Sequence, residues 1–153
     1  MRIEDEIKQP VFRNDFEKAI INLSYTVGWL EVRQAAAFRP FSLTLPQFNI
    51  LRILRGQHPQ PATVALLIDR MLDKTSNASR IVDRLEEKQL VTRCVCPVNR
   101  RAVDIRITDA GLELLGRIEA EDILNPVRLG LGAFSADELY QLNELLDKMR
   151  SDN

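Results

Sequence analysis

The spacing of hydrophobic residues along the chain predicts a mainly α-helical protein with one β-hairpin. In most segments, apolar positions recur every three or four residues, which is the period of an amphipathic helix. These helical segments run over about 14–37, 44–56, 64–71, 74–88, 109–123 and 135–150. Two strand-like runs, 90–95 and 102–107, are separated by a turn at 96–101, and the second run alternates almost ideally, with Val103, Ile105 and Ile107 facing inward.

Several helix starts carry local signals. Thr44 followed by Gln47, and Ser135 followed by Glu138, have the spacing of a capping box, in which each side chain satisfies a backbone N–H of the other. Further N-caps are expected at Thr63 and Thr108. Gly111 and Gly116 weaken the helix that follows Thr108, and the sequence alone offers no account of them.

The helix predicted over about 74–88 has a clean division of faces. Ala78, Ile81, Val82 and Leu85 form one apolar stripe. The remaining positions at its start and along it are polar or basic: Thr75, Ser76, Asn77, Ser79, Arg80 and Arg84. Short polar side chains at the start of a helix, with arginines along it, suit insertion into the major groove of DNA.

A doubly basic turn follows this helix, at Asn99, Arg100 and Arg101 between the two predicted strands. A base-reading helix beside a basic hairpin is the layout of a winged-helix DNA-binding domain. The chain carries a net charge of −1, but segment 70–106 holds nine basic residues against five acidic ones. Positive charge is therefore concentrated where this interpretation places the DNA, although a solvated basic surface would show the same excess.

The order and spacing of four motifs resemble the MarR family of bacterial transcriptional regulators. They are 43–48 (LTLPQF), 77–88 (NASRIVDRLEEK), 90–91 (LV), and 99–101 (NRR) followed by 105–111 (IRITDAG). The resemblance implies a single domain over 1–153, with a winged-helix lobe at 44–108 and dimerisation helices at 1–38 and 112–153. It implies a homodimer that binds a pseudo-palindromic site on double-stranded DNA, by default as a repressor, and that a small aromatic effector releases. A monomeric helical core is the alternative to the dimer.

The chain departs from the family pattern at two positions. Asn99 stands where an aspartate is common, so it can accept a hydrogen bond from Arg101 without adding charge. Gln89 replaces a common glycine directly after the predicted recognition helix. If the backbone at Gln89 is left-handed, this side chain carries strain.

The candidate DNA contacts fall into three groups. Ser76, Asn77, Ser79 and Arg80, with Thr75 at the helix start, are expected to face the major groove. Lys74, Arg84 and Arg93 are expected to hold phosphates, and Arg100 or Arg101, with Arg101 preferred, to enter the minor groove. Helix capping by Thr75 and Ser76, a surface pair of Arg84 with Glu87, and a merely exposed basic turn remain as alternatives.

Regulation leaves weaker signals. Tyr25, Trp29 and Phe48 are candidate walls of an effector pocket, although aromatic residues at helical spacing usually belong to a core. Cys94 and Cys96 point to the same face of a predicted strand and cannot easily bridge each other. We favour them as small structural residues over oxidant sensors.

Other classes of protein fit less well. The polar N-terminus and the lack of an apolar run of about 18 residues predict a cytoplasmic chain without a membrane span. The only histidine, His58, has no catalytic partner at a recognisable spacing, so neither an enzyme nor a cofactor or metal site is expected. The main alternative is a winged helix that docks a protein. Such a module should expose apolar residues on its recognition helix, whereas this one is polar there.

Overall fold

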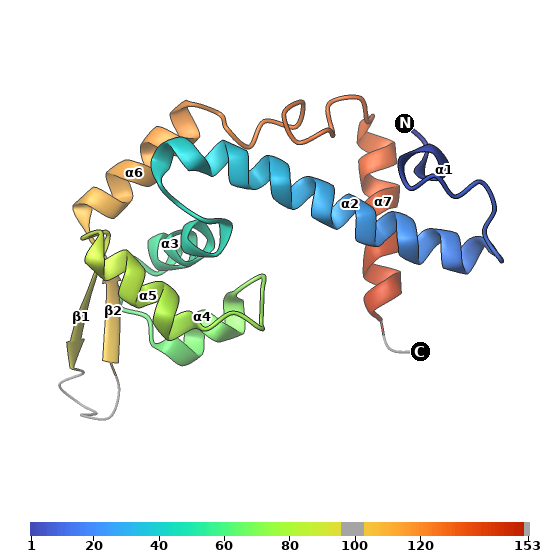
Figure 1. Ribbon diagram of the computed structural model, residues 1–153. Coiled ribbons are helices and arrows are strands. Elements are labelled where there is room, and N and C mark those ends of the chain that lie inside the picture. Colours follow the sequence, from blue (N-terminus) through green and yellow to red (C-terminus); the bar gives the residue numbers. More distant parts are fainter. Residues whose placement is uncertain (96–102, 152–153) are drawn as a thin grey trace. The chain divides into compact units, whose positions relative to one another are not determined.

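A computed structural model describes residues 1–95 and 103–151 of the chain (Figure 1). The chain divides into two compact units, Met1–Ile123 and Leu124–Asn153, which are described separately. The division lies inside the segment 112–153 that the resemblance assigns to dimerisation. None of the helices in the described part of the chain combines the length and apolar content that a membrane span requires.

The first unit begins with a short helix, α1 (Ile3–Glu6), and the long helix α2 (Asp15–Phe38). Asn14 caps α2 by accepting a hydrogen bond from the backbone N–H of Glu17 at 2.9 Å. A single 3-10 turn, η1 (Arg39–Phe41), ends the helix where Pro40 restricts the backbone. The sequence predicted α2 closely, whereas α1 and η1 were not anticipated because each is about one turn long.

Three shorter helices form the body of the lobe: α3 (Leu45–Gln57), α4 (Val64–Arg70) and α5 (Ala78–Glu87). The predicted capping box of Thr44 and Gln47 is present at the start of α3, and Thr63 caps α4. The side chains of these helices meet in one core together with Phe38, whose ring centroid lies 4.6 Å from that of Phe48. The fully buried residues include Ile50, Leu51, Leu54, Leu67, Val82, Leu85, Ile105, Leu115 and Ile118.

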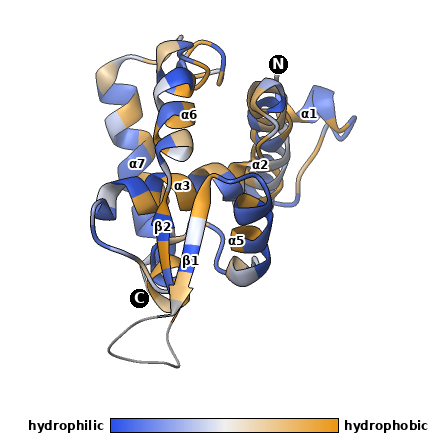
Figure 2. Cartoon of the chain, turned by 90° about the vertical axis from the view of Figure 1, so that its left-hand side faces the viewer, coloured by the Kyte–Doolittle hydropathy of each residue, from blue (hydrophilic) through white to orange (hydrophobic). Residues whose placement is uncertain are grey.

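The hairpin follows α5 as β1 (Val91–Val95) and β2 (Val103–Ile107), which pair antiparallel (Figure 2). Ile105 is fully buried, but Val103 is 39% exposed, so the prediction that it faces inward was wrong. Val103 opens β2 and pairs with Val95, at the end of the hairpin away from α6 (Figure 1). An isolated β-bridge joins Ala62 to Ile105, with N···O distances of 2.9 and 2.8 Å. It connects the segment just before α4 to the hairpin.

The last helix of the first unit is α6 (Asp109–Ala120), capped by Thr108 as predicted. It ends earlier than the expected residue 123, because Asp122 takes a left-handed backbone conformation (φ 46°). Gly111 faces the hairpin so closely that a Cβ there would lie 2.5 Å from the carbonyl oxygen of Leu90. Close approach of α6 to the base of the hairpin is thus the reason for this glycine, whereas Gly116 faces open space.

The second unit consists of turns followed by α7 (Ala136–Arg150). Its capping box, Ser135 with Glu138, is present as predicted, and the two hydrogen bonds from Ser135 to the carboxylate lower the pKa of Glu138. No residue of α7 is buried. Hydrophobic and hydrophilic residues both mark its surface in Figure 2.

Candidate nucleic-acid interface

Helix α5 has the two faces that the sequence predicted, but it begins at Ala78 instead of near Lys74, so the predicted start was wrong. Ala78, Val82 and Leu85 are buried against the rest of the lobe, while Ser79 and Arg80 are exposed. The exposed face begins at Asn77, whose side chain caps the helix by accepting a hydrogen bond from the backbone N–H of Arg80 at 3.1 Å. The Asn77 amide oxygen thus has one bond within the helix, while the N–H₂ group is available to donate to a base edge.

The loop before α5 is organised by Asp73, a residue that the sequence analysis missed. Its carboxylate accepts hydrogen bonds from the hydroxyl and backbone N–H of Thr75, at 2.6 and 2.8 Å, and from the hydroxyl of Ser76. The bonds from Ser76 and then Thr75 lower the pKa of Asp73 to about 2. Neither hydroxyl caps α5, so the capping alternative for Thr75 and Ser76 is wrong. An aspartate two residues before a threonine was the available signal, because this spacing favours an Asx turn.

Lys74 points back toward α4. Its ammonium donates hydrogen bonds to the carbonyl oxygens of Ile68, at 3.1 Å, and Asp69. These carbonyls belong to the last turn of α4, where a cation also interacts favourably with the helix dipole. Lys74 therefore has a local partner in the free protein, although it remains exposed.

The two arginines on the outer face of α5 have different surroundings. Arg84 pairs with Glu87 at 2.9 Å, as the alternative from sequence held, but both side chains are more than 60% exposed and such a pair is weak. No partner of the Arg80 guanidinium lies within residues 1–95 and 103–151. Both arginines line a polar groove of about 350 Å³ between α5 and the start of α3, which Thr44 and Pro46 border on the other side.

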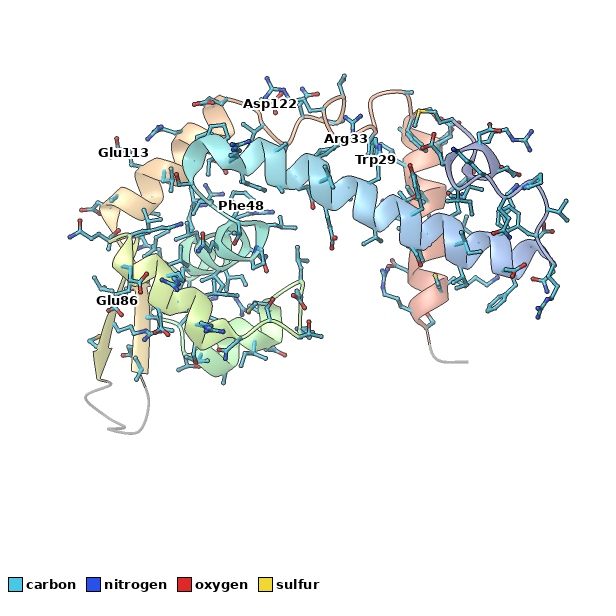
Figure 3. All side chains as sticks on the ribbon, viewed as in Figure 1. Trp29, Arg33, Phe48, Glu86, Glu113 and Asp122 are labelled. Atoms are coloured by element: carbon cyan, nitrogen blue, oxygen red, sulfur yellow. The ribbon has the colours of Figure 1, made fainter. Side chains whose placement is uncertain are left out.

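Arg93 of β1 lies against α5. It pairs with Asp83 at 2.5 Å and donates to the carbonyl oxygen of Ser79 at 2.9 Å. Its Nε lies 3.8 Å from a carboxylate oxygen of Glu86, a residue that Figure 3 marks on α5. Arg93 was predicted to hold a phosphate, whereas these contacts direct its guanidinium toward α5.

Several predicted residues lie outside the described residues, namely Cys96, Asn99, Arg100 and Arg101. Cys94 is described, and it is a free and exposed thiol whose sulfur lies 3.9 Å from the carbonyl oxygen of Asp104. No group of three or more potential metal ligands occurs in the part of the chain that the structure describes.

Of the three candidate effector residues, Tyr25 and Trp29 lie together on α2, whereas Phe48 lies apart from them. Phe48 is part of the lobe core, the alternative that the sequence analysis favoured. Trp29 lies on α2 with the guanidinium of Arg33 stacked 4.1 Å above its ring, as Figure 3 shows (Trp29 and Arg33). Tyr25 and Trp29 both border a shallow apolar depression of about 470 Å³. The Tyr25 hydroxyl donates a hydrogen bond to Glu6 at 2.5 Å.

Comparison with known proteins decides the family. Residues 43–103, which span α3 to the start of β2, match the model of the MarR family. The chain is 30% identical over 112 residues to the HTH-type transcriptional regulator MgrA of Staphylococcus aureus, and the match covers 73% of each protein. The chain belongs to the MarR family. Its members are transcriptional regulators that bind DNA through a winged helix, so the fold and function class predicted from sequence are confirmed.

Solved structures agree with this assignment. The crystal structure of a MarR transcription factor from Planctomyces limnophilus is 34% identical and superimposes with a TM-score of 0.68, covering 90% of this chain and 98% of that one. A mutant of MarR from E. coli complexed with operator DNA superimposes with a TM-score of 0.76 over 92% of this chain and 99% of that one. At 20% identity the second likeness shows the shared fold.

Proposed function

We propose that this MarR-family chain represses transcription by binding, as a homodimer, an operator made of two inverted half-sites. The observation that carries the proposal is the exposed polar face of α5, with the Arg80 guanidinium beside an open groove and without a partner among the described residues. A face of this kind can donate hydrogen bonds to base edges without first breaking an internal ion pair.

The residues of the loop and helix divide by what their free donors can reach. We assign Arg80, Ser79 and the amide N–H₂ of Asn77 to base edges in the major groove. We assign Thr75, Ser76, Lys74 and Arg84 to the phosphates on either side of that groove, because their present partners are local and exposed. Arg100 or Arg101, with Arg101 preferred, keeps the minor-groove role that the sequence predicts, and Asn99 keeps the role of a hydrogen-bond acceptor for Arg101.

The proposal includes a dimer because the helices outside the lobe leave apolar side chains in solvent. In α2, Phe16 and Val32 are more than 70% exposed, and in α7 no residue is buried. Large exposed apolar areas usually mark an interface. A second copy that covers them would place two α5 helices on one duplex, which matches the dimeric action of this family.

An aromatic effector remains a proposal for the α2 surface. Trp29 and Tyr25 supply aromatic walls, and the Arg33 guanidinium lies over the Trp29 ring. We propose that the protein acts in the cytoplasm, where operator DNA lies. We propose no enzymatic activity for it, because the relatives are named as transcriptional regulators.

The test is selection of the full-length protein on a randomised duplex library at two salt concentrations, followed by sequencing. We expect an inverted repeat with half-site centres about one helical turn apart, and weaker binding at the higher salt because counterions are released. Binding that ignores both sequence and salt would contradict the proposal and would favour a winged helix that docks a protein.

A further inference from the structure

We infer that Arg93 is a positioning residue that fixes the wing hairpin against the recognition helix, instead of a contact to DNA. The inference deepens the proposed function, on which its consequence for DNA binding rests. It starts from the ion-pair cluster of Arg93 with Asp83 and Glu86, which joins β1 to α5.

The guanidinium is held by groups spread along two turns of α5. Nη1 pairs with Oδ1 of Asp83 at 2.5 Å, Nη2 donates to the backbone oxygen of Ser79 at 2.9 Å, and Nε lies 3.8 Å from Oε2 of Glu86. The side chain is only 26% exposed, and its Nε is buried without a hydrogen-bond partner among the described residues, so Glu86 contributes through its charge alone. A planar guanidinium with several partners is restricted in direction, so it transmits orientation as well as charge.

The charge balance of this cluster argues against a phosphate contact. Two carboxylates, those of Asp83 and Glu86, face one guanidinium, so the cluster offers no surplus positive charge to a nearby phosphate. To reach DNA, Arg93 would have to leave Asp83 and the Ser79 carbonyl. Arg84 is the opposite case, because its side chain is 62% exposed and pairs with one carboxylate on its own helix.

The cluster gives the hairpin a second point of attachment. Close to α5, β1 is already fixed by the hydrogen bond from the Leu90 N–H to the Leu85 carbonyl at 3.0 Å. Arg93 lies three residues further along and pairs with Ile105 across the hairpin. One point of attachment leaves the strand free to pivot, whereas two points define its direction relative to α5.

This direction matters because α5 and the hairpin are the two elements proposed to enter adjacent grooves. If the hairpin pivots freely, part of the binding free energy is spent on ordering it when DNA binds. Removal of Arg93 should therefore weaken binding without changing the number of phosphates that the protein neutralises. A phosphate contact predicts the contrary, since each lost contact makes the negative slope of log K against log[salt] shallower by about 0.9.

The experiment measures the affinity of the full-length protein for its selected duplex across a series of salt concentrations. The variants are Arg93→Gln, Arg84→Gln as the matched control, Asp83→Asn, and the double variant Asp83→Asn/Arg93→Gln. We expect Arg93→Gln to weaken binding about tenfold with an unchanged slope. Arg84→Gln should make the negative slope shallower by about 0.9 for each of its contacts, hence by about 1.8 in a dimer.

Coupling between the two partners provides the second readout. If Arg93 acts through Asp83, the effect of Arg93→Gln on affinity should be smaller in the Asp83→Asn background than in the wild-type background. The inference would be overturned if Arg93→Gln made the salt slope shallower, as Arg84→Gln should. It would also be overturned if Arg93→Gln left the affinity for the duplex unchanged.

Failure of the proposed function is distinguishable from failure of this inference. If the wild-type protein binds no duplex, the proposed function fails, and amide hydrogen exchange of the free protein then tests whether Arg93 fixes the hairpin against α5. Faster exchange in β1 for Arg93→Gln, with unchanged exchange in α3 and in the Arg84→Gln control, supports this positioning role. Unchanged exchange in β1 overturns it.

Discussion

Arg80 and Arg84 lie about one turn apart on the exposed face of α5, yet their surroundings predict different losses on truncation. Arg80 has no partner among the described residues, and a good bidentate contact to a base is worth about 1–3 kcal/mol of discrimination. We expect Arg80→Ala to reduce the ratio of affinities for selected and scrambled duplexes by tenfold or more, in order of magnitude. Arg84→Ala should weaken both duplexes alike, and fluorescence anisotropy with both DNAs measures the two ratios. An unchanged ratio for Arg80→Ala would remove Arg80 from the base-reading set.

Gln89 confirms the strain that the sequence analysis attached to it. Its φ is 60°, in the left-handed region, where an L side chain costs about 1–2 kcal/mol. The conformation is imposed by a Schellman motif at the end of α5, in which the Gln89 N–H bonds to Glu86 at 2.8 Å and the Leu90 N–H to Leu85. Gln89→Gly should therefore raise the free energy of unfolding by about 1 kcal/mol.

The control for this prediction is Gln89→Ala, which removes the polar side chain but keeps the Cβ and thus the strain. Urea unfolding of the three proteins gives the comparison, provided that their m-values agree. Equal stabilisation by glycine and alanine would mean that the polar side chain, and not the backbone conformation, destabilises the wild-type protein.

Single residues of the site were predictable from sequence only where local spacing decides. The helical period alone places Arg80 opposite Val82 and Ser79 at the edge of the apolar stripe, and both side chains are exposed in the structure. The partners of Lys74 and Arg93 were not predictable, because both are contacts to another element and depend on how the elements pack.

At the scale of elements, the helix starts that carry a capping box were predicted best, whereas α5 begins four residues later than predicted. The capping signals at Thr44 and Ser135 involve residues three positions apart, so sequence contains the whole interaction. The end of α6 depends on a left-handed Asp122, which has no strong sequence signal. The pairing of Ala62 with Ile105 was missed for a similar reason, since one residue has no alternation to recognise.

The two glycines of α6 make a matched test of how this helix packs. A Cβ at Gly111 would lie 2.5 Å from the Leu90 carbonyl oxygen and 2.7 Å from Cγ1 of Ile107, whereas a Cβ at Gly116 would meet nothing within 4 Å. We expect Gly111→Ala to lower the free energy of unfolding by about 1–3 kcal/mol through overpacking. Gly116→Ala should raise it by about 1 kcal/mol through helix propensity.

Thermal unfolding followed by circular dichroism checks both signs at once. The pair is informative because the two substitutions are chemically identical and lie five residues apart on one helix. If Gly111→Ala proved neutral, α6 would be able to move away from the hairpin, and the close approach at Leu90 would not be needed for stability.

At the scale of the molecule, each unit has apolar surface that it does not bury itself. Of the 24 residues of α2, only Phe38 is buried, and Phe16 is 76% exposed. In the second unit, Leu145 of α7 is 65% exposed. The helical period of apolar residues in the first and last helices marks these stripes in the sequence. It could not indicate which side chains meet, since that depends on the partner copy.

Leu145 tests whether α7 contributes to the dimer. In the single chain this side chain is 65% exposed, so an aspartate there costs the folded monomer little. In a dimer interface, the same carboxylate would be buried without a partner, which is strongly unfavourable. We therefore expect the wild-type protein to sediment at twice the chain mass of 17.5 kDa, and Leu145→Asp to sediment as a folded monomer. Gln141→Asp, at an exposed polar position one turn earlier, should remain dimeric.

If Leu145→Asp also stays dimeric at every concentration, α7 lies outside the interface, and the exposed residues of α2 become the next surface to substitute. A monomeric Leu145→Asp protein should in addition lose preference for the inverted repeat over a single half-site, because only a dimer presents two α5 helices to one duplex.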